Sequence, residues 1–202
     1  MSFVLISQRV VEETSYRERR DMLDQRWSMF LQACGLIPIP VPNTSTFDPE
    51  RIQSLPVSGI ILSGGNDLAH YGGDAPERDA REWEMLDLAI RMQWPVLGVC
   101  RGMQSMVCYD GGRLSPVEKH VVTEHQISWQ GRSRRVNSYH RWQCTLPDTN
   151  WKVVACSDDG VIEAASHLQH RWFGIMWHPE RNETFAEDDI ELFRIHFRVS
   201  DT

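Results

Sequence analysis

Short apolar segments alternate with amphipathic ones through the first half of the chain. Apolar runs occupy residues 3–7, 36–41, 59–62 and 96–99, and each has the length of a buried β-strand. Pro38 and Pro40 favour an edge position for the second run, because proline cannot donate a hydrogen bond to a neighbouring strand. The pattern therefore predicts several strands of one sheet.

The segments between these runs have helical spacing. Apolar residues recur every three or four positions within residues 19–35, and Gly35 can end that helix. A helix is also expected at residues 48–55, where Asp48 can cap it and Pro49 suits the first helical position. Residues 79–94 predict a further amphipathic helix, ended by Pro95.

The second half has a different pattern. Short strand-like segments separated by polar turns occupy residues 125–129, 134–139, 151–157, 160–166 and 171–177. Residues 186–198 predict a closing helix with Ile190, Phe193 and Phe197 on one face. The expected fold is α/β, with a mostly parallel sheet, helices on both faces and an antiparallel β-ribbon region in the second half. We expect residues 1–202 to form a single domain.

Composition and charge narrow the function classes. Of 202 residues, 41% are hydrophobic and 24% are charged, as in an ordinary soluble protein. The net charge of −7 argues against nonspecific binding to nucleic acid or anionic membranes. No secretory signal or membrane span is evident, and the five cysteines have no paired spacing. We therefore expect reduced thiols and a cytoplasmic protein.

Cys100 stands where a predicted strand meets a predicted helix. It lies between Gly98 and Gly102, in the spacing G-x-C-x-G, the cysteine version of a nucleophile elbow. Glycines let such a turn close, and the N-terminus of the following helix favours a thiolate and can hold an oxyanion. By itself the motif could equally be a buried thiol at a glycine turn.

A second motif follows the last predicted strand. His178, Pro179 and Glu180 form an H-P-E segment, and residues i and i+2 of an extended chain point to the same side. A catalytic base needs an acid to orient it, and this spacing can supply one. Together, the elbow and the H-P-E segment favour a catalytic interpretation over a surface ion pair.

These motifs resemble the class I glutamine amidotransferase superfamily, in particular its γ-glutamyl hydrolases. Cys100, Gly102 and Gln104 match C-x-G-x-Q, and the S-G-G loop at residues 63–65 and the H-P-E segment occur in the family's order. Residues 136–140, V-N-S-Y-H, resemble the segment that holds the substrate's glutamyl end. The resemblance implies a flavodoxin-like fold.

The resemblance also implies roles for single residues. Cys100 would be the nucleophile, His178 the general base and acid, and Glu180 its orienting carboxylate. The oxyanion hole would use the backbone N–H groups of Gly65 and Arg101. The expected substrate-binding residues are Asn66, Gln104, Ser138 and Tyr139. No organic cofactor and no metal would be needed.

The leaving group is a finer question. The opening of the chain and residues 15–27 resemble the short γ-glutamyl-CDP-amidate hydrolases of capsule phosphoramidate biosynthesis, which implies release of L-glutamate and cytidine diphosphoramidate. Arg101 after the nucleophile is more typical of stand-alone γ-glutamyl hydrolases than of glutaminase subunits. A γ-glutamyl-aminobutyrate-type hydrolase, a glutaminase subunit feeding a separate synthase, and a non-catalytic binding module remain as alternatives.

A run of arginines bears on that question. Arg132, Arg134, Arg135 and Arg141 could bind a pyrophosphate, with Tyr139 or Trp142 stacking on a base. A solvated basic face is an equally good interpretation. Asp67, after the S-G-G loop, either faces a passing ligand or caps the next helix.

The remaining expectations concern metals and partners. His120 and His125 could pair as metal ligands, but no third ligand has suitable spacing, and without a C-x-x-C motif a zinc site is not expected. The expected partner is a small γ-glutamyl substrate, with neither nucleic acid nor a membrane, and a homodimer is left open.

Overall fold

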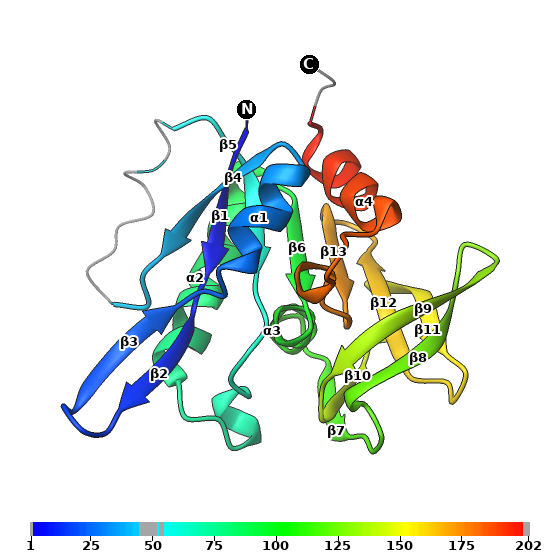
Figure 1. The fold of residues 1–202 in the computed structure, drawn as a ribbon, viewed down its shortest axis with the longest axis horizontal. Helices are drawn as coiled ribbons and strands as arrows, with labels where there is room; N and C mark the ends of the chain where they lie inside the picture. Colours follow the sequence, from blue (N-terminus) through cyan, green and yellow to red (C-terminus); the bar gives the residue numbers. More distant parts are fainter. Residues whose placement is uncertain (1, 45–51, 53–54, 200–202) are drawn as a thin grey trace.

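The computed structural model describes residues 2–44, 52 and 55–199. Its main sheet has nine strands in the order β4-β1-β5-β6-β13-β12-β11-β8-β9 (Figure 1). In chain order these strands are β1 Ser2–Ser7, β4 Leu36–Val41, β5 Val57–Leu62, β6 Val96–Val99, β8 Val121–Trp129, β9 Arg132–Tyr139, β11 Trp151–Ser157, β12 Ile162–His167 and β13 Trp172–Ile175.

The sheet has a parallel half and an antiparallel half. The five strands from β4 to β13 pair in parallel, and the strands from β13 to β9 pair antiparallel. The expected antiparallel region is thus confirmed, and it continues the same sheet. A separate two-stranded ribbon joins β7 Arg113–Pro116 to β10 Trp142–Thr145.

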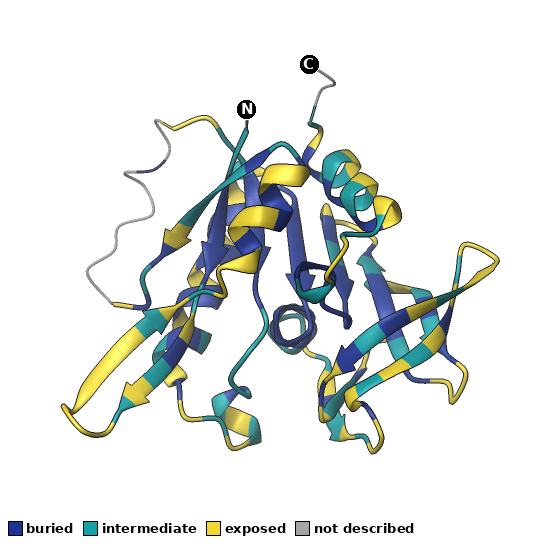
Figure 2. Cartoon of the chain, in the orientation of Figure 1, coloured by how far each residue is buried: buried dark blue, intermediate teal, exposed yellow. Residues whose placement is uncertain are grey.

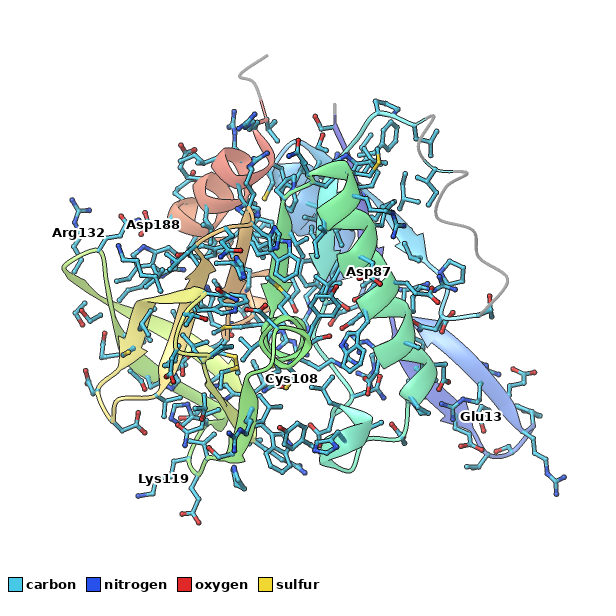
Figure 3. The ribbon with its side chains drawn as sticks, turned by 180° about the vertical axis from the view of Figure 1, so that it is seen from behind. Glu13, Asp87, Cys108, Lys119, Arg132 and Asp188 are labelled. Carbon is cyan, nitrogen blue, oxygen red and sulfur yellow. The ribbon has the colours of Figure 1, made fainter. Side chains whose placement is uncertain are left out.

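Helices cover both faces of the sheet, as the pattern predicted. They are α1 Arg26–Ala33, α2 Pro76–Met92, α3 Arg101–Tyr109 and α4 Glu187–Phe197. Figure 1 shows α1 and α4 in front of the sheet, and Figure 3, seen from behind, shows α2 in front. None of the described helices is long and apolar enough to cross a bilayer.

Alternation along the strands divides the core in two. Leu5 and Ile60 pack with α2 and α3, whereas their neighbours Ile6 and Ile61 pack with α1 and α4. Both sets are fully buried, because successive strand residues point to opposite faces and both faces are covered (Figure 2). This explains why these strands are continuous apolar runs.

One element differs from the sequence prediction. The first helix was expected to begin at residue 19, but residues 19–22 belong to β3 Glu18–Met22, which pairs antiparallel with β2 Arg9–Glu13. Met22 is accordingly exposed, and the helix begins at Arg26. The helix expected at residues 48–55 falls almost wholly outside the described residues.

Candidate active site

Cys100 joins β6 to α3 in a strained backbone conformation. Its φ of 53° and ψ of −107° lie in a region that residues with a side chain rarely adopt. A Cβ added to Gly98 would come within 2.6 Å of Gly102, and one on Gly102 would come within 2.0 Å of the Leu62 carbonyl oxygen. The glycines are therefore required sterically, as the elbow motif predicted. Such strain is typical of an elbow that raises a nucleophile.

His178 and Glu180 form a buried pair beside Cys100. The Nδ1 atom of His178 lies 2.7 Å from Oε1 of Glu180, and both side chains are almost fully buried. The expected proximity is present, but Glu180 reaches it through a 3₁₀ turn, η3 Pro179–Arg181, rather than an extended chain. Gly64 lies against the imidazole, since a Cβ there would approach Cε1 to 2.4 Å.

The surroundings of His178 keep its imidazole protonated. Burial alone would lower the pKa of His178. The charges of Glu180 and Cys100, with side-chain hydrogen bonds to both, outweigh burial and raise that pKa to about 9. At neutral pH the His178 imidazolium therefore lies between the Glu180 side chain and the Cys100 sulfur.

Asn137 fixes the backbone of His178, a role that sequence analysis did not assign. Its side-chain Oδ1 accepts from the N–H of His178 and its Nδ2 donates to the carbonyl of the same residue, each at 2.8 Å. Nδ2 also donates to Asn182. Asn137 belongs to the V-N-S-Y-H segment, so this segment positions the base of the site.

Helix α2 holds the S-G-G loop in place through Arg78, a contact that the sequence did not predict. Arg78 is fully buried and donates to the carbonyl oxygens of Ser63, Gly64 and Gly65 at 2.7, 3.1 and 2.5 Å. It also pairs with Glu82 at 3.1 Å. With the loop's carbonyls bound to this guanidinium, the position of the Gly65 amide is fixed by a helix.

Arg101 takes part in the same buried network. Its side chain pairs with Glu82 and Asp79 of α2. Its backbone N–H belongs to the first turn of α3, where amides have no partner within the helix. Gly65 and Arg101 line one pocket with Cys100, as an oxyanion hole would require.

The expected substrate-binding side chains have protein partners. Asn66 exchanges two 2.9 Å hydrogen bonds with the backbone of Val10, and so joins the β2–β3 hairpin to the loop. Gln104 donates to the carbonyl of Trp142 at 2.9 Å. Both residues line the pocket, but these contacts give them a framework role alongside any contact with substrate.

The other two expected binding residues are neighbours on β9. The Ser138 side chain is buried and donates to the His120 carbonyl at 2.7 Å. Tyr139 lines the pocket, with its ring 5.5 Å from the His178 ring, edge to face. The Arg181 guanidinium lies 4.4 Å from the centre of that Tyr139 ring.

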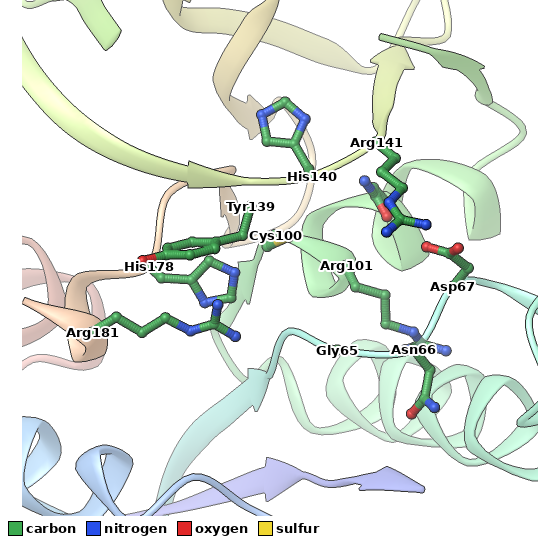
Figure 4. A pocket seen from close by; sticks show the side chains of 11 residues that line it. Gly65, Asn66, Asp67, Cys100, Arg101, Tyr139, His140, Arg141, His178 and Arg181 are labelled. Carbon is green, nitrogen blue, oxygen red and sulfur yellow. The ribbon is translucent and has the colours of Figure 1, made fainter. Parts of the chain in front are cut away.

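The pocket has a volume of about 230 Å³ and opens beside Cys100 (Figure 4). Arg141 and Arg181 lie on its two sides, and Asp67 lines it near Arg141. Asp67 therefore faces the pocket rather than only ending a turn. Arg181 follows the H-P-E segment directly, and this adjacency is a signal that could have identified it.

The arginines of residues 132–141 do not act together. Arg134 pairs with Asp189 of α4, and Arg135 lies 2.7 Å from Glu124 on the exposed strand surface. Arg132 lies at the far tip of the β8–β9 turn in Figure 3, in a groove shared with Asp188. Of these four described arginines, Arg141 alone lines the pocket. Arg141 is therefore the residue of the predicted pyrophosphate site that remains a candidate for binding a ligand in this pocket.

Trp142 also lies apart from the expected stacking role. Its ring packs 5.2 Å from Tyr71, and its side chain belongs to the edge of the core. Tyr139 is therefore the aromatic ring of this segment that lines the pocket.

Comparisons with known proteins identify the family of the chain. The peptidase C26 family matches residues 4–180. The γ-glutamyl-CDP-amidate hydrolase of Campylobacter jejuni subsp. jejuni serotype O:2 is 31% identical over 200 residues, which is 98% of each chain. The γ-glutamyl-γ-aminobutyrate hydrolase of Escherichia coli O157:H7 is 27% identical over 215 residues, covering 87% of this chain and 83% of the relative.

A solved structure supports the fold. A candidate GMP synthase component from Thermoplasma acidophilum superposes with a TM-score of 0.74 at 18% identity, covering 98% of this chain and 93% of that one. The predicted flavodoxin-like α/β fold is thereby confirmed.

Proposed function

Because this chain belongs to the peptidase C26 family, within the class I glutamine amidotransferase-like proteins, we propose that it hydrolyses a γ-glutamyl amide bond through Cys100. The observation that carries the proposal is the buried His178–Glu180 pair directed at a cysteine on a strained elbow. Nucleophile, base and orienting acid are the parts that covalent acyl transfer needs.

The first half of the proposed reaction breaks the amide. The proton that Cys100 and His178 share is already on His178, so the sulfur attacks the γ-carbonyl carbon as a thiolate. The oxyanion of the tetrahedral intermediate is held by the backbone N–H groups of Gly65 and Arg101. The imidazolium then donates its proton to the nitrogen as the C–N bond breaks, leaving a γ-glutamyl thioester. The raised pKa of His178, about 9, keeps that proton available at neutral pH.

The second half releases glutamate. His178 removes a proton from water, whose oxygen attacks the thioester carbon. The C–S bond breaks and the sulfur leaves as a thiolate, which restores the starting pair with the proton on His178. Net consumption is one water molecule for each amide bond, and this proposed route uses no organic cofactor.

For the leaving group, we propose a nucleoside diphosphate amide, γ-glutamyl-CDP-amidate, which yields L-glutamate and cytidine diphosphoramidate for capsule phosphoramidate synthesis. The similarity to the Campylobacter jejuni hydrolase over the whole chain supports this choice. Arg141 and Arg181 add two guanidiniums to the pocket, and guanidiniums suit phosphate oxygens. The aminobutyrate of the alternative substrate carries a single carboxylate.

A substrate panel tests the proposal. Values of kcat/KM are compared for γ-glutamyl-CDP-amidate, γ-glutamyl-γ-aminobutyrate and glutamine, each with wild type and Cys100→Ala. We expect cleavage that depends on Cys100 and is fastest for the CDP-amidate. Glutaminase activity that appears only when a synthase is added would instead favour a role in supplying ammonia.

A further inference from the structure

A cluster of histidines surrounds one buried carboxylate behind the V-N-S-Y-H segment. Glu163 of β12 is fully buried, and its Oε1 atom is approached by three imidazoles. The distances are 3.3 Å to Nδ1 of His120, 3.2 Å to Nε2 of His125 and 3.3 Å to Nε2 of His140. A third possible metal ligand beside His120 and His125, which the spacing in the sequence did not reveal, is thus Glu163 of a different strand.

Outer contacts fix which nitrogens carry hydrogen in the neutral rings. Nε2 of His120 lies 3.1 Å from the Asp159 carboxylate, and Nδ1 of His140 lies 3.2 Å from the carbonyl of Trp142. Each of these outer nitrogens faces an acceptor, so each is the N–H donor. Metal-binding histidines are usually oriented by such carboxylate and carbonyl acceptors.

The inward-facing atoms are then all acceptors. Nδ1 of His120 and Nε2 of His140 lie 3.2 Å apart, and both face Oε1 of Glu163. These two nitrogens and Oε1 of Glu163 form a triangle of acceptor atoms. One added proton can bridge only two of the three atoms, whereas one metal cation at the centre can bind all three. Lone pairs this close, in a buried place, require a positive centre.

Buried polar atoms without hydrogen-bond partners occur in the same cluster. Oε2 of Glu163 is buried with no hydrogen-bond partner, and so are both ring nitrogens of His125. The contact from His125 to Glu163 is close enough for attraction but lacks hydrogen-bond geometry. Of these atoms, Nε2 of His125 lies 3.2 Å from Oε1 of Glu163, and an unpartnered buried nitrogen facing this cluster is consistent with a missing ligand.

We propose that His120, His140 and Glu163 bind one transition-metal ion of the Zn²⁺ class, with His125 completing the coordination. Zn²⁺ bonds of about 2.0–2.1 Å in a tetrahedron place neighbouring ligand atoms about 3.3 Å apart. Four of the six ligand-to-ligand distances of such a tetrahedron are 3.2–3.3 Å and match that edge length, and the ligand atoms of His120, His125 and Glu163 all lie within 4.8 Å of one another. The donor set of imidazoles and one carboxylate is one that Zn²⁺ accepts.

The role of this metal is structural. It ties β8 and the end of β9 to β12, and the Ser138 side chain bonds to the His120 carbonyl beside it. His140 lines the pocket, and Figure 4 shows its ring directed away from Cys100, so the metal would lie on the far side of this residue from the sulfur. Binding would hold Tyr139 and Arg141 in place without contact with the scissile bond. The side chain of His125 is 17% exposed, which leaves an entry path.

The test uses the full chain in a Cys100→Ala background, so that the active-site thiol cannot bind metal. Protein is stripped with a chelator, and Zn²⁺ binding is measured by competition with a chromophoric chelator and by metal analysis after desalting. We expect one equivalent with a Kd of about 1 µM or tighter, a rise in Tm, and with Co²⁺ the intense visible absorption of a tetrahedral site.

Two variants locate the site. His125→Ala, at a half-buried position, should weaken Zn²⁺ binding by at least about tenfold, while His70→Ala, at an exposed histidine elsewhere, should not. Absence of stoichiometric binding to the stripped protein overturns the proposal and assigns the cluster to shared protons. Binding that His125→Ala leaves unchanged also overturns it. Neither result bears on γ-glutamyl hydrolysis by Cys100.

Discussion

At the residue scale, the elbow geometry makes Cys100 the residue on which we expect turnover to depend. Cys100→Ala removes the sulfur and leaves the pocket and the helix unchanged. We expect a loss of about 10⁴-fold or more in kcat, because losing the nucleophile of a triad removes the covalent route. Cys108→Ser, a change on the same helix whose thiol lies outside the pocket, should retain activity. If Cys100→Ala keeps a tenth of the wild-type kcat, the mechanism is wrong.

The His178–Glu180 pair allows a prediction about pH. Burial lowers the pKa of His178, and the charge of Glu180 is the largest contribution that raises it, to about 9. In Glu180→Gln that charge is absent, so the pKa of His178 should fall. Because the protonated imidazole is needed by the leaving nitrogen, the alkaline limb of the kcat/KM profile should move to lower pH.

His178→Asn provides the comparison for that profile. It should be nearly inactive at every pH, whereas Glu180→Gln should retain partial activity with a shifted limb. An alkaline limb that stays in place in Glu180→Gln would mean that another group controls it. Negligible effects of both changes would remove these residues from the site.

At the scale of elements, α2 supports the S-G-G loop through buried charges. Burial opposes ionisation of Glu82, but the guanidiniums of Arg101 and Arg78 hold its pKa below the usual value. Glu82→Gln removes the carboxylate that both arginines share, so that Arg78 loses its paired charge and Arg101 keeps only Asp79, which should lower the free energy of unfolding by about 3–5 kcal/mol. Denaturant unfolding measures this loss.

A matched control lies one half-turn away on α2. Glu84 pairs with Arg81 but is 55% exposed, so Glu84→Gln should cost no more than about 1 kcal/mol. Similar losses for the two variants would show that the buried network contributes little to stability.

The contact between α4 and β6 predicts how stability depends on pH. His196 lies on α4 and contacts the Val96 carbonyl at 3.0 Å, and burial lowers the pKa of His196 to about 4. Between pH 6.5 and 4 the unfolded chain binds a proton at this residue and the folded chain does not, so stability falls as the pH falls. At pH 5 this contribution is about 2 kcal/mol relative to neutral pH.

His196→Gln tests that contribution, because glutamine does not titrate and its amide can donate to the same carbonyl. The loss of unfolding free energy between pH 7 and pH 5 should be smaller in this variant than in wild type. An unchanged loss would assign the acid sensitivity to other groups.

At the scale of the whole molecule, the sequence could predict those parts of the fold in which burial requires a regular pattern of apolar residues. Strands β1, β5 and β6 are buried on both faces, so each is a continuous apolar run. The β2–β3 hairpin was not predicted, because β3 is polar and the apolar pair Met22 and Leu23, with Leu23 four residues before Trp27, extends the helical pattern toward it by chance. An exposed hairpin buries too little apolar surface to require a regular spacing of apolar residues in the sequence.

The site residues that could be predicted are likewise those that belong to local sequence motifs. Cys100, His178 and Glu180 lie in two short motifs, so the sequence could identify them. Asn137 contacts His178 across 41 residues, and Arg78 contacts Ser63 across 15. Such partners are brought together by tertiary packing, and their types and spacing carry no local signal of it.

The pocket also depends on the whole molecule, because both halves of the sheet contribute to it. Cys100 and Asp67 follow strands of the parallel half, whereas Tyr139 and Arg141 come from the antiparallel half. A glutamyl subsite accepts any γ-glutamyl amide, so discrimination between leaving groups must come from contacts with the other part of the substrate. Arg141 and Arg181 line the pocket, so we expect them to make such contacts.

Arg141→Ala should therefore act on substrate choice rather than on chemistry. If the leaving group carries phosphates, loss of a charge-assisted contact should lower kcat/KM for γ-glutamyl-CDP-amidate by about ten- to a hundredfold. Glutamine, which has no phosphates, should be cleaved at an unchanged kcat/KM. Arg135→Ala, at a surface arginine paired with Glu124, should affect neither substrate. Equal losses on both substrates would make Arg141 a structural residue and would return the leaving group to the smaller amides.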